Sequence, residues 1–386
     1  MKKFALTLII LISHLMSFVA YGDAIRIDGV SYYFNYSDTT ASVAEDRYPH
    51  GEGSLYTDLE TTIPAYVDYD NLRFKVTTIN QCAFRESEIE ILHLPETVVN
   101  LNPESLSSMH KLRIITVSEE NPALQVVDNV LFSKDMKILW LYPVFRGGKP
   151  DSACRIEKYV VPEGVEEIYL GFENTGLKHI SFPSTLKKIG NYGIACETLT
   201  ELELPESLEY LGWNALTNLT ISGPLHLPDN ISYIGDDCFE NSKFTSVNIP
   251  LNITRIGEGW FRKSDISSIE FHDHVTTIGS LAFYEASKLK ELALPESVVE
   301  IENGAFGWSN IESLKLGMGI ERIGDVFWSG TSLTDIYCSR YIAPEVDTTY
   351  PLGLEWTLGE VTVHVRPGCA EAYEKTPWKL VGPIIE

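Results

Sequence analysis

The chain has 386 residues, and 54 acidic against 30 basic residues give it a formal net charge of −24. A hydrophobic fraction of 44% excludes a disordered acidic tail, because such tails lack the apolar side chains that form a core. The charge argues against nucleic acid and bare anionic membrane as partners, since contacts to phosphates need a basic surface.

The first residues have the layout of a secretory signal peptide. Lys2 and Lys3 precede an apolar run, and Ala20 and Gly22 occupy the −3 and −1 positions of a cleavage site after Gly22. A short membrane anchor is the alternative interpretation of this run. No cysteine precedes Cys82, so a lipoprotein attachment cysteine is not evident. We therefore expect an exported protein that is extracellular, on the cell surface or periplasmic.

The cysteines do not form a recognisable framework. An even number in an exported chain raises the possibility of disulfides, but the spacing is scattered and contains no CxxC pair. Free cysteine packs as a small apolar residue. We expect this for Cys82, Cys238 and Cys338 and leave the disulfide status of the six open: Cys82, Cys154, Cys196, Cys238, Cys338 and Cys369.

A repeat of about 22 residues organises most of the chain. An apolar residue, usually followed by glycine, recurs in steps of 21 to 23 residues, and we call it the anchor; one gap, from Leu101 to Ile168, is 67 residues, or about three periods. Sustained periods of this length are typical of solenoids, in which each repeat buries its apolar side against its neighbours. The anchors are Ile79, Leu101, Ile168, Ile189, Leu211, Ile234, Ile256, Ile278, Ile301 and Ile323.

Each position of the repeat predicts a structural role. The glycine after the anchor indicates either a positive φ or a close approach of two backbones. Five residues after the anchor, large apolar side chains form a predicted core column, from Phe84 to Trp328. A six-residue strand pattern follows and usually ends at proline, which withholds a backbone donor and ends the ladder. Examples run from Leu199 to Leu204 and from Leu289 to Leu294.

The repeat unit resembles that of the BspA-like leucine-rich-repeat family of bacterial secreted and cell-surface proteins. The segments LTELELPESLEYLGWNAL and LKELALPESVVEIENGAF carry the resemblance most clearly. It implies an α/β repeat solenoid of the leucine-rich-repeat type. We expect a parallel β-sheet on the concave face, short helical turns and loops on the convex face, and a β-rich N-terminal cap. Departures from the pattern, such as His272 in place of the strand-ending proline, affect local turns only.

The expected organisation has four parts. Residues 1–22 form the signal peptide, and residues 23–78 form the β-rich N-terminal cap. Residues 79–340 form the solenoid, with a hairpin insertion near 127–143. Residues 341–386 form the C-terminal cap, in which a short helix after Pro367 precedes Trp378.

No pattern predicts catalysis or a cofactor. The histidines are scattered over different repeats with no nucleophile column beside them, and there is no phosphate-binding loop. His272, Asp273 and His274 form a compact ligand-like cluster, but zinc needs three or four ligands and no further partner is identifiable. Asp68, Asp70 and Asn71 are oxygen ligands for calcium in principle, but a hairpin turn explains them more simply. We expect a protein that is not an enzyme.

Macromolecular binding is the predicted function. The resemblance implies a protein partner, such as a host extracellular or envelope protein, for adhesion or host interaction. The outward positions of the strands are polar, and two tryptophans stand in otherwise polar columns. A glycan-binding module and a structural envelope protein are the alternatives, and a plain solvated surface would explain the charge equally well. The candidate partner-binding residues are Glu201, Glu203, His226, Glu270, Glu291, Lys315, Asp335, Tyr337, Trp213 and Trp308.

Overall fold

The computed structural model describes residues 24–45, 56–144, 157–173, 175–325, 332–346 and 361–386. The expected signal peptide, Cys154 and Trp328 lie outside these ranges. The chain divides into two compact units, Met1–Val126 and Val127–Glu386, which are considered separately below.

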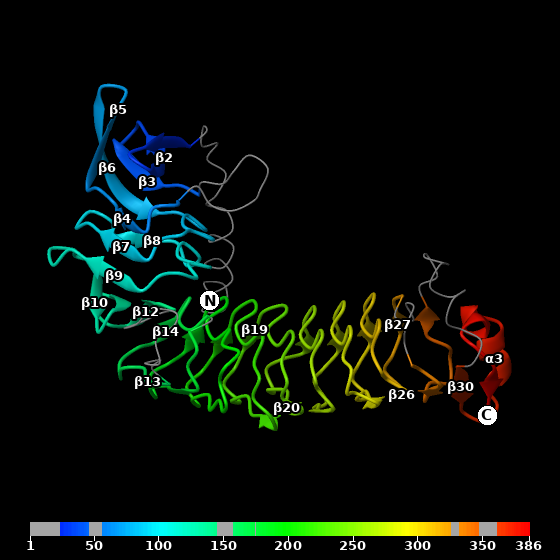
Figure 1. Cartoon of the computed structure of the whole chain (residues 1–386). Coiled ribbons are helices and arrows are strands. Elements are labelled where there is room, and N and C mark those ends of the chain that lie inside the picture. The colour runs from blue at the N-terminus through cyan, green and yellow to red at the C-terminus, as the bar shows by residue number, and fades with distance from the viewer. Residues whose placement is uncertain (1–23, 46–55, 145–156, 174, 326–331, 347–360) are drawn as a thin grey trace, which may run out of the picture. The chain divides into compact units, whose positions relative to one another are not determined.

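The first unit contains a six-stranded sheet with the order β1-β2-β3-β6-β5, in which β8 also pairs with β6 (Figure 1). Two-residue turns with positive φ join neighbouring antiparallel strands at Asp28-Gly29 and at Asp70-Asn71. Asn, Asp and Gly suit such turns because they tolerate the left-handed conformation. The strands are β1 (Ile25–Ile27), β2 (Val30–Asn35), β3 (Thr40–Val43), β5 (Tyr66–Tyr69), β6 (Leu72–Ile79) and β8 (Asn100–Leu101).

The first coils of the repeat also belong to this unit. A second, parallel sheet has the order β4-β7-β9, with strands β4 (Glu60–Thr62), β7 (Ile91–Leu94) and β9 (Ile114–Val117). The anchors Ile79 and Leu101 are register partners where β6 pairs with β8 in parallel. The repeat ladder therefore begins at β6, directly after the hairpins.

In the second unit, every coil contributes a short anchor strand. Ile168, Ile189, Leu211 and Ile234 are successive register partners in parallel strands, and all four are buried. We call these ladders the anchor sheet. After β10 (Leu124–Val127), they comprise β11 (Val130–Ser133), β12 (Ile138–Leu141), β14 (Glu167–Ile168), β16 (Lys188–Ile189), β17 (Tyr210–Leu211) and β19 (Tyr233–Ile234), then β21 (Arg255–Ile256), β23 (Thr277–Ile278), β25 (Glu300–Ile301), β27 (Arg322–Ile323) and β29 (Glu345–Val346). Within this set, β11 and β12 pair antiparallel as a hairpin.

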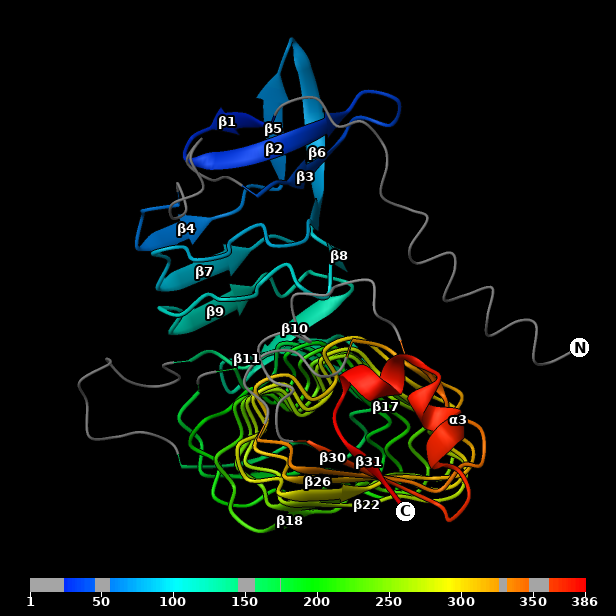
Figure 2. The ribbon, with the colours of Figure 1, turned by 90° about the vertical axis from the view of Figure 1, so that its right-hand side faces the viewer.

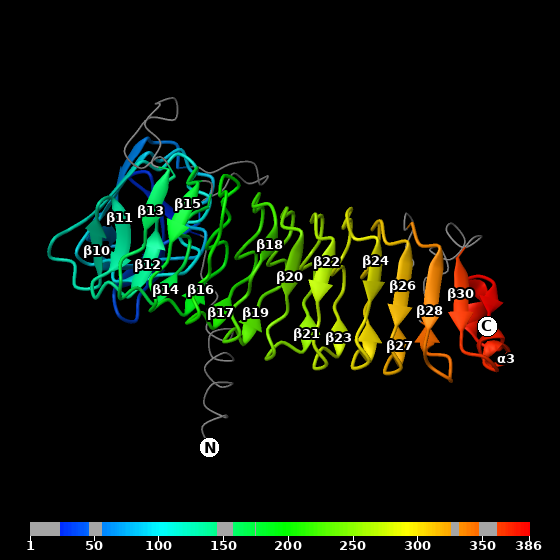
Figure 3. The same cartoon turned by 90° about the horizontal axis from the view of Figure 1, so that it is seen from below.

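The other strand of each coil forms a separate set of parallel ladders, which we call the strand sheet. Its middle residues, such as Val247 and Leu292, are buried, while the residues on either side point outward. Figure 3 shows these strands side by side from β18 to β30, and Figure 2 shows the coils superposed along the stack. The strands are β13 (Lys158–Val160), β15 (His179–Ser181), β18 (Pro224–Leu225), β20 (Ser246–Asn248), β22 (Ser268–Glu270), β24 (Glu291–Ala293), β26 (Ser313–Leu316), β28 (Asp335–Cys338), β30 (Thr362–Val365) and β31 (Ile384–Ile385).

Hydrogen-bonded turns replace the short helical turns that the sequence suggested. In most coils the third and seventh residues after the anchor have positive φ, for example 51° at Asp237 and 54° at Asn241, so a helix cannot continue through them. Alternate backbone N–H groups instead donate to the next coil, as Phe261 does to the carbonyl of Ala282 at 2.8 Å. The second unit is thus a β-solenoid, and within the described ranges its helices are α3 (Ala370–Glu374) and η1 (Pro377–Leu380).

The glycine after the anchor serves close packing rather than an unusual φ. None of the six glycines in this column has a positive φ. A Cβ on Gly235 would lie 2.6 Å from the backbone nitrogen of Trp213 and 2.7 Å from the carbonyl carbon of Gly212. Neighbouring coils therefore approach too closely here for any side chain.

Stacked aromatic rings fill the core column of the central coils. Phe239, Phe261, Phe283 and Phe306 follow one another with centroid separations of 5.6, 5.4 and 5.8 Å. Each belongs to a different coil, so the column ties neighbouring coils together by apolar contact. After the last coil, Trp378 is fully buried and donates from Nε1 to the Pro344 carbonyl at 2.9 Å.

Candidate binding surface

The outward side chains of the strand sheet in the second unit form a continuous polar surface, which we call the strand face. It includes eight of the ten sequence-derived candidates. Glu201 and Glu203 lie on an extended segment between β15 and β18, and the others lie on or beside strands: His226, Glu270, Glu291, Lys315, Asp335 and Tyr337. All are exposed except Asp335, which is half-buried.

The candidates on this face differ in what they contact. Within the described residues, the side chains of Glu203, Glu270 and Glu291 form no hydrogen bond or ion pair. Glu201 accepts a hydrogen bond from His179 Nδ1 at 2.7 Å. Three carboxylates in the central coils are therefore unneutralised by neighbouring side chains and available to a cationic group.

Asp335, Tyr337 and His364 form a cluster at the C-terminal end of the face. His364 Nε2 lies 2.6 Å from Asp335 Oδ1, and its ring stacks on Tyr337 at 4.3 Å with an interplanar angle of 10°. The hydrogen bond from His364, supported by one from Thr334, lowers the pKa of Asp335. These contacts hold Tyr337 in a fixed orientation while it remains exposed.

The two candidate tryptophans lie in the turns, away from the strands. Trp213 is 42% exposed and meets the ring of Tyr192 edge to face at 5.0 Å. Its Nε1 points at Asp237 Oδ2, 3.3 Å away. Burial raises the pKa of Asp237, although Arg262 opposes this shift. Trp308 is 52% exposed and has a φ of 55°.

A shallow pocket of about 350 Å³ lies beside Trp213. Its wall combines two aromatic rings with amides and with charged groups that partly neutralise one another. Arg262 Nε lies 3.1 Å from Glu240 Oε1, and Asn241 Nδ2 donates to Asn218 Oδ1 at 2.7 Å. The lining residues are Tyr192, Trp213, Asn214, Thr217, Asn218, Glu240, Asn241, Arg262 and Lys263.

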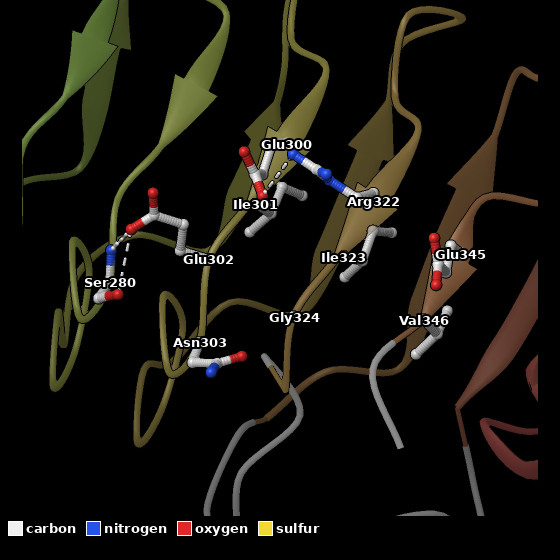
Figure 4. Close-up of a pocket in the computed structure, with 10 residues that line it drawn as sticks. All are labelled: Ser280, Glu300, Ile301, Glu302, Asn303, Arg322, Ile323, Gly324, Glu345 and Val346. Atoms are coloured by element: carbon white, nitrogen blue, oxygen red, sulfur yellow. Dashed lines mark hydrogen bonds and ion pairs between the residues drawn. The ribbon is translucent and has the colours of Figure 1, made fainter. Parts of the chain in front are cut away.

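A larger open pocket, of about 760 Å³, lies on the anchor sheet around Glu300, Glu302 and Arg322 (Figure 4). Its charges are largely matched within the chain. Arg322 Nη2 lies 3.1 Å from Glu300 Oε1, and Glu302 Oε2 accepts from the hydroxyl of Ser280 at 3.1 Å and from Arg255 Nη2 at 2.7 Å. The hydrogen bond from Arg255 is the main cause of the lowered pKa of Glu302. The charged groups around Glu302 and Arg322 are therefore paired ions.

The described part of the chain holds no recognisable metal site, and two of its buried cysteines are poor nucleophiles. It contains no group of three or more His, Cys, Asp or Glu side chains placed to share a metal ion. His272 Nε2 instead lies 3.0 Å from the Pro250 carbonyl, and its Nδ1 accepts from the backbone of His274. Burial raises the pKa of the Cys338 thiol to about 12, and that of Cys238 still further, so neither is a ready thiolate.

The structure also brings the candidate Tyr337 together with a cluster of residues that the repeat columns did not predict. We call this cluster the end patch. Its residues lie on β28 and β30 or just after β26, β28 and β30, and apart from Tyr337 its one sequence signal was the adjacent pair Tyr341 and Ile342. The end patch comprises Met318, Tyr337, Tyr341, Ile342, His364 and Arg366.

Comparison with known families decides what kind of solenoid this is. The model of the BspA type leucine-rich repeat region matches six copies in residues 67–139, 152–266 and 254–343, which is more than half of the chain. The chain belongs to this family. A search of curated proteins finds no sequence match. Among the described residues of this BspA-type protein, no helix has the length and apolar character needed to cross a membrane.

A solved structure agrees with this assignment at the level of fold. A leucine-rich repeat protein from Eubacterium ventriosum superposes with a TM-score of 0.51 at 14% identity, over 81% of this chain and 96% of that one. A leucine-rich repeat protein from Bacteroides ovatus gives a TM-score of 0.38 at 21% identity, over 81% and 94%. A leucine-rich cell surface protein from Faecalibacterium prausnitzii gives 0.37 at 15% identity, over 84% and 95%.

Proposed function

We propose that this BspA-type protein is an exported, non-catalytic binding protein that recognises a protein partner through the strand face. The observation that supports this most directly is the set of unneutralised carboxylates at Glu203, Glu270 and Glu291 on one polar surface. Export is supported by the leader-like pattern of residues 1–22.

The strand face suits a protein better than a small molecule. Parallel strands repeat about every 4.8 Å, so the outward side chains form a long, nearly regular array. An extended partner surface contacts several coils of such an array at once, and a small molecule does not. The exposed carboxylates favour a partner with a basic or mixed-charge surface, because complementary charge raises the association rate and selects the partner.

The central test compares two triple charge reversals. One variant carries Glu201→Lys, Glu203→Lys and Glu270→Lys on the strand face. The matched control carries Glu209→Lys, Glu258→Lys and Glu345→Lys, which are exposed carboxylates on or near the anchor strands and turns. Both change the net charge equally, so nonspecific electrostatic effects are the same in the two.

The partner is first captured with the mature protein from host extracellular material and from bacterial envelope, and its affinity is then measured by surface plasmon resonance. We expect the strand-face variant to lose about tenfold or more in affinity, while the control stays within about threefold of wild type. Equal affinities of the two variants would contradict binding through this face.

A glycan is the second candidate ligand, because the pocket beside Trp213 combines an exposed aromatic face with amides and paired charges. Sugar C–H groups pack on aromatic faces, and amides satisfy sugar hydroxyls. A glycan array probed with wild type, Trp213→Ala and Trp308→Ala tests this. Hits that vanish with Trp213→Ala support the site, and an array without hits removes it. If neither protein nor glycan binds and the chain assembles with itself, a structural envelope role replaces both.

A further inference from the structure

The end patch reverses the character of the strand face. Along the central coils the charged exposed residues are the carboxylates Glu201, Glu203, Glu270 and Glu291, but the last coils present aromatic, aliphatic and basic side chains. Lys315, Tyr337 and His364 are consecutive register partners on β26, β28 and β30. Met318, Tyr341 and Arg366 each follow one of these strands by one to three residues, so they form a second row beside the first.

Large apolar side chains of the end patch are open to solvent. Ile342 is 70% exposed, Tyr341 62%, Met318 48% and Tyr337 38%. Exposed apolar clusters of this kind mark contact sites, and Tyr, Met and Arg are the residue types enriched at protein interfaces. Isolated exposed apolar residues are ordinary, but here four occur on neighbouring coils.

Arg366 holds the second row together. Its Nη1 donates to the Tyr341 hydroxyl at 2.9 Å, its Nη2 lies 3.4 Å from Met318 Sδ, and its Cζ lies 4.8 Å from the centre of the Tyr341 ring. These contacts fix the guanidinium plane before any partner arrives. A pre-positioned group loses less conformational entropy on binding, which raises affinity.

Arg366 has no carboxylate partner within the described residues, although acidic residues outnumber basic ones by 54 to 30 in this chain. The nearby carboxylates have other partners. Asp335 is bound by His364, Glu296 accepts from the backbone N–H of Met318, and Glu386 accepts from the backbone N–H of Ala370 at 3.0 Å. A guanidinium has five N–H donors and matches a carboxylate with two of them. Among the described residues, this preferred ligand is not paired with Arg366.

We infer that the end patch docks a segment of the protein partner that carries a carboxylate next to aromatic or aliphatic side chains. The carboxylate would pair with Arg366, with Lys315 as the nearest additional cation in register, and the apolar side chains would cover Tyr341, Ile342 and Met318. Both parts are needed, because an exposed ion pair alone contributes little. Covering the apolar rings removes water from the pair and strengthens it.

This inference deepens the proposed function and rests on it in one respect, namely that the strand face meets a protein. It also predicts how the partner is oriented along the strand face. The partner would present basic groups opposite Glu201, Glu203 and Glu270 and an acidic, apolar segment opposite the last coils. A partner docked in the reverse sense would place like charges together at both ends, which costs affinity.

The test uses synthetic peptides as the probe, so it needs no identified partner. Three fluorescent peptides share a Gly/Ser frame and a central Phe-X-Leu, where X is Glu, Gln or Lys. Their binding to the mature full chain is measured by fluorescence polarisation up to about 1 mM. We expect the Glu peptide to bind about tenfold more tightly than the Gln peptide and still more tightly than the Lys peptide.

Substitutions assign the effect to the patch. Arg366→Gln should remove the preference for Glu over Gln, and Arg366→Lys should retain part of it, since charge remains but the planar fork is lost. Tyr341→Ala should weaken the Glu and Gln peptides alike. Arg322→Gln, at an exposed arginine of the anchor sheet, is the control and should behave as wild type. Circular dichroism spectra and melting temperatures verify that each variant is folded.

Two outcomes overturn the inference: no binding of the Glu peptide up to the highest concentration, or a Glu preference that persists in Arg366→Gln. The strand-face triple variant separates this result from the proposed function. If it loses the captured partner but keeps the peptide preference, both proposals stand. If it keeps the partner and the peptide preference, the end patch stands and the central carboxylates do not bind.

Discussion

At the scale of single residues, Gly212 and Gly235 show how closely the coils of the second unit approach. The backbone of one coil occupies the space that a Cβ on the next would need. Glycine after the anchor therefore allows a coil to pack close to its neighbour, and the coils that have this glycine can pack at the same distance.

Replacing Gly235 by alanine should destabilise the protein by about 1–3 kcal/mol, because the added methyl meets backbone atoms that cannot move independently. Gly307→Ala is the control, since its Cβ would meet the ring of Tyr284 at 2.9 Å, and a side chain can shift. Urea denaturation of both variants measures the difference. A Gly235→Ala protein as stable as Gly307→Ala would show that the coils can separate without cost.

The cysteines give a second residue-scale prediction. Cys196, Cys238, Cys338 and Cys369 are buried and free, and burial raises the pKa of Cys238 and Cys338. Since the thiolate is the reactive form, these thiols should resist Ellman's reagent at pH 8 in the native protein and react fully in urea. Titration in both conditions, with peptide mapping of the labelled residues, checks this. Rapid native labelling of Cys238 would contradict the burial.

At the scale of elements, the turns between anchor and strand depend on two left-handed residues in most coils. Glycine and asparagine accept this conformation easily, whereas Leu281, Glu285 and Trp308 adopt it at an energetic cost. The inter-coil hydrogen bonds from the turns compensate for that cost, as Glu285 donates to the Gly307 carbonyl at 2.9 Å.

Glu285→Gly should therefore stabilise the protein by about 1 kcal/mol, because glycine relieves the strain of a φ of 57° at an exposed site. Glu285→Ala removes the same carboxylate but keeps a Cβ, so it should give no comparable gain. The melting temperatures of the two variants, compared with wild type, isolate the backbone effect. Equal shifts would assign the change to charge and remove the strain argument.

These elements also show how far the sequence could lead. The anchors, the phenylalanine column and the strands were predictable because apolar side chains repeat at one spacing. The turns were not, because the left-handed sites hold residues as unlike as Tyr192, Asn218 and Leu281. The role of the glycine after the anchor could not be predicted either, since a positive φ and close packing of two backbones both favour glycine.

The candidate site divides in the same way. Alternation along each strand predicted which side chains point outward, so the acidic part of the strand face could be identified residue by residue. The end patch could not, because Met318, Tyr341 and Arg366 lie beyond the strand ends, where no column relates them. Only the three-dimensional stacking of β26, β28 and β30 brings them into contact.

At the scale of the whole molecule, electrostatics combine local attraction with general repulsion. Many basic side chains pair with carboxylates on neighbouring coils, as Lys137 does with Glu166 at 2.7 Å and Lys290 with Glu312 at 2.6 Å. The remaining surplus of acid gives the net charge of −24. The local ion pairs should therefore stabilise the folded chain, whereas the repulsion among the surplus carboxylates should destabilise it. Changes of pH and of salt concentration test these two effects.

The ion pair between Glu302 and Arg255 tests the local attraction. Arg255 lowers the pKa of Glu302 below the usual 4.5, so the pair contributes stability above that pH and loses it as pH falls through the folded value. Glu302→Gln should cost about 1 kcal/mol or less at pH 7, and the difference from wild type should become smaller at pH 3, below the unfolded pKa. Urea denaturation at both pH values measures this, with Glu209→Gln as the control. A difference that grew on acidification would reverse the assigned sign.

The dependence of stability on salt concentration tests the general repulsion. Each exposed ion pair contributes only a few tenths of a kcal/mol, whereas the repulsion among surplus carboxylates acts over the whole surface. Raising NaCl from about 20 mM to about 500 mM shortens the Debye length from roughly 20 Å to roughly 4 Å and screens both. Because repulsion dominates in a chain of this charge, the melting temperature should rise by several degrees.

The variant with Glu201→Gln, Glu203→Gln and Glu270→Gln should have a higher melting temperature at low salt and a smaller rise with salt, since it has removed part of the repulsion. A melting temperature that fell with salt would mean that the inter-coil ion pairs outweigh the surplus charge.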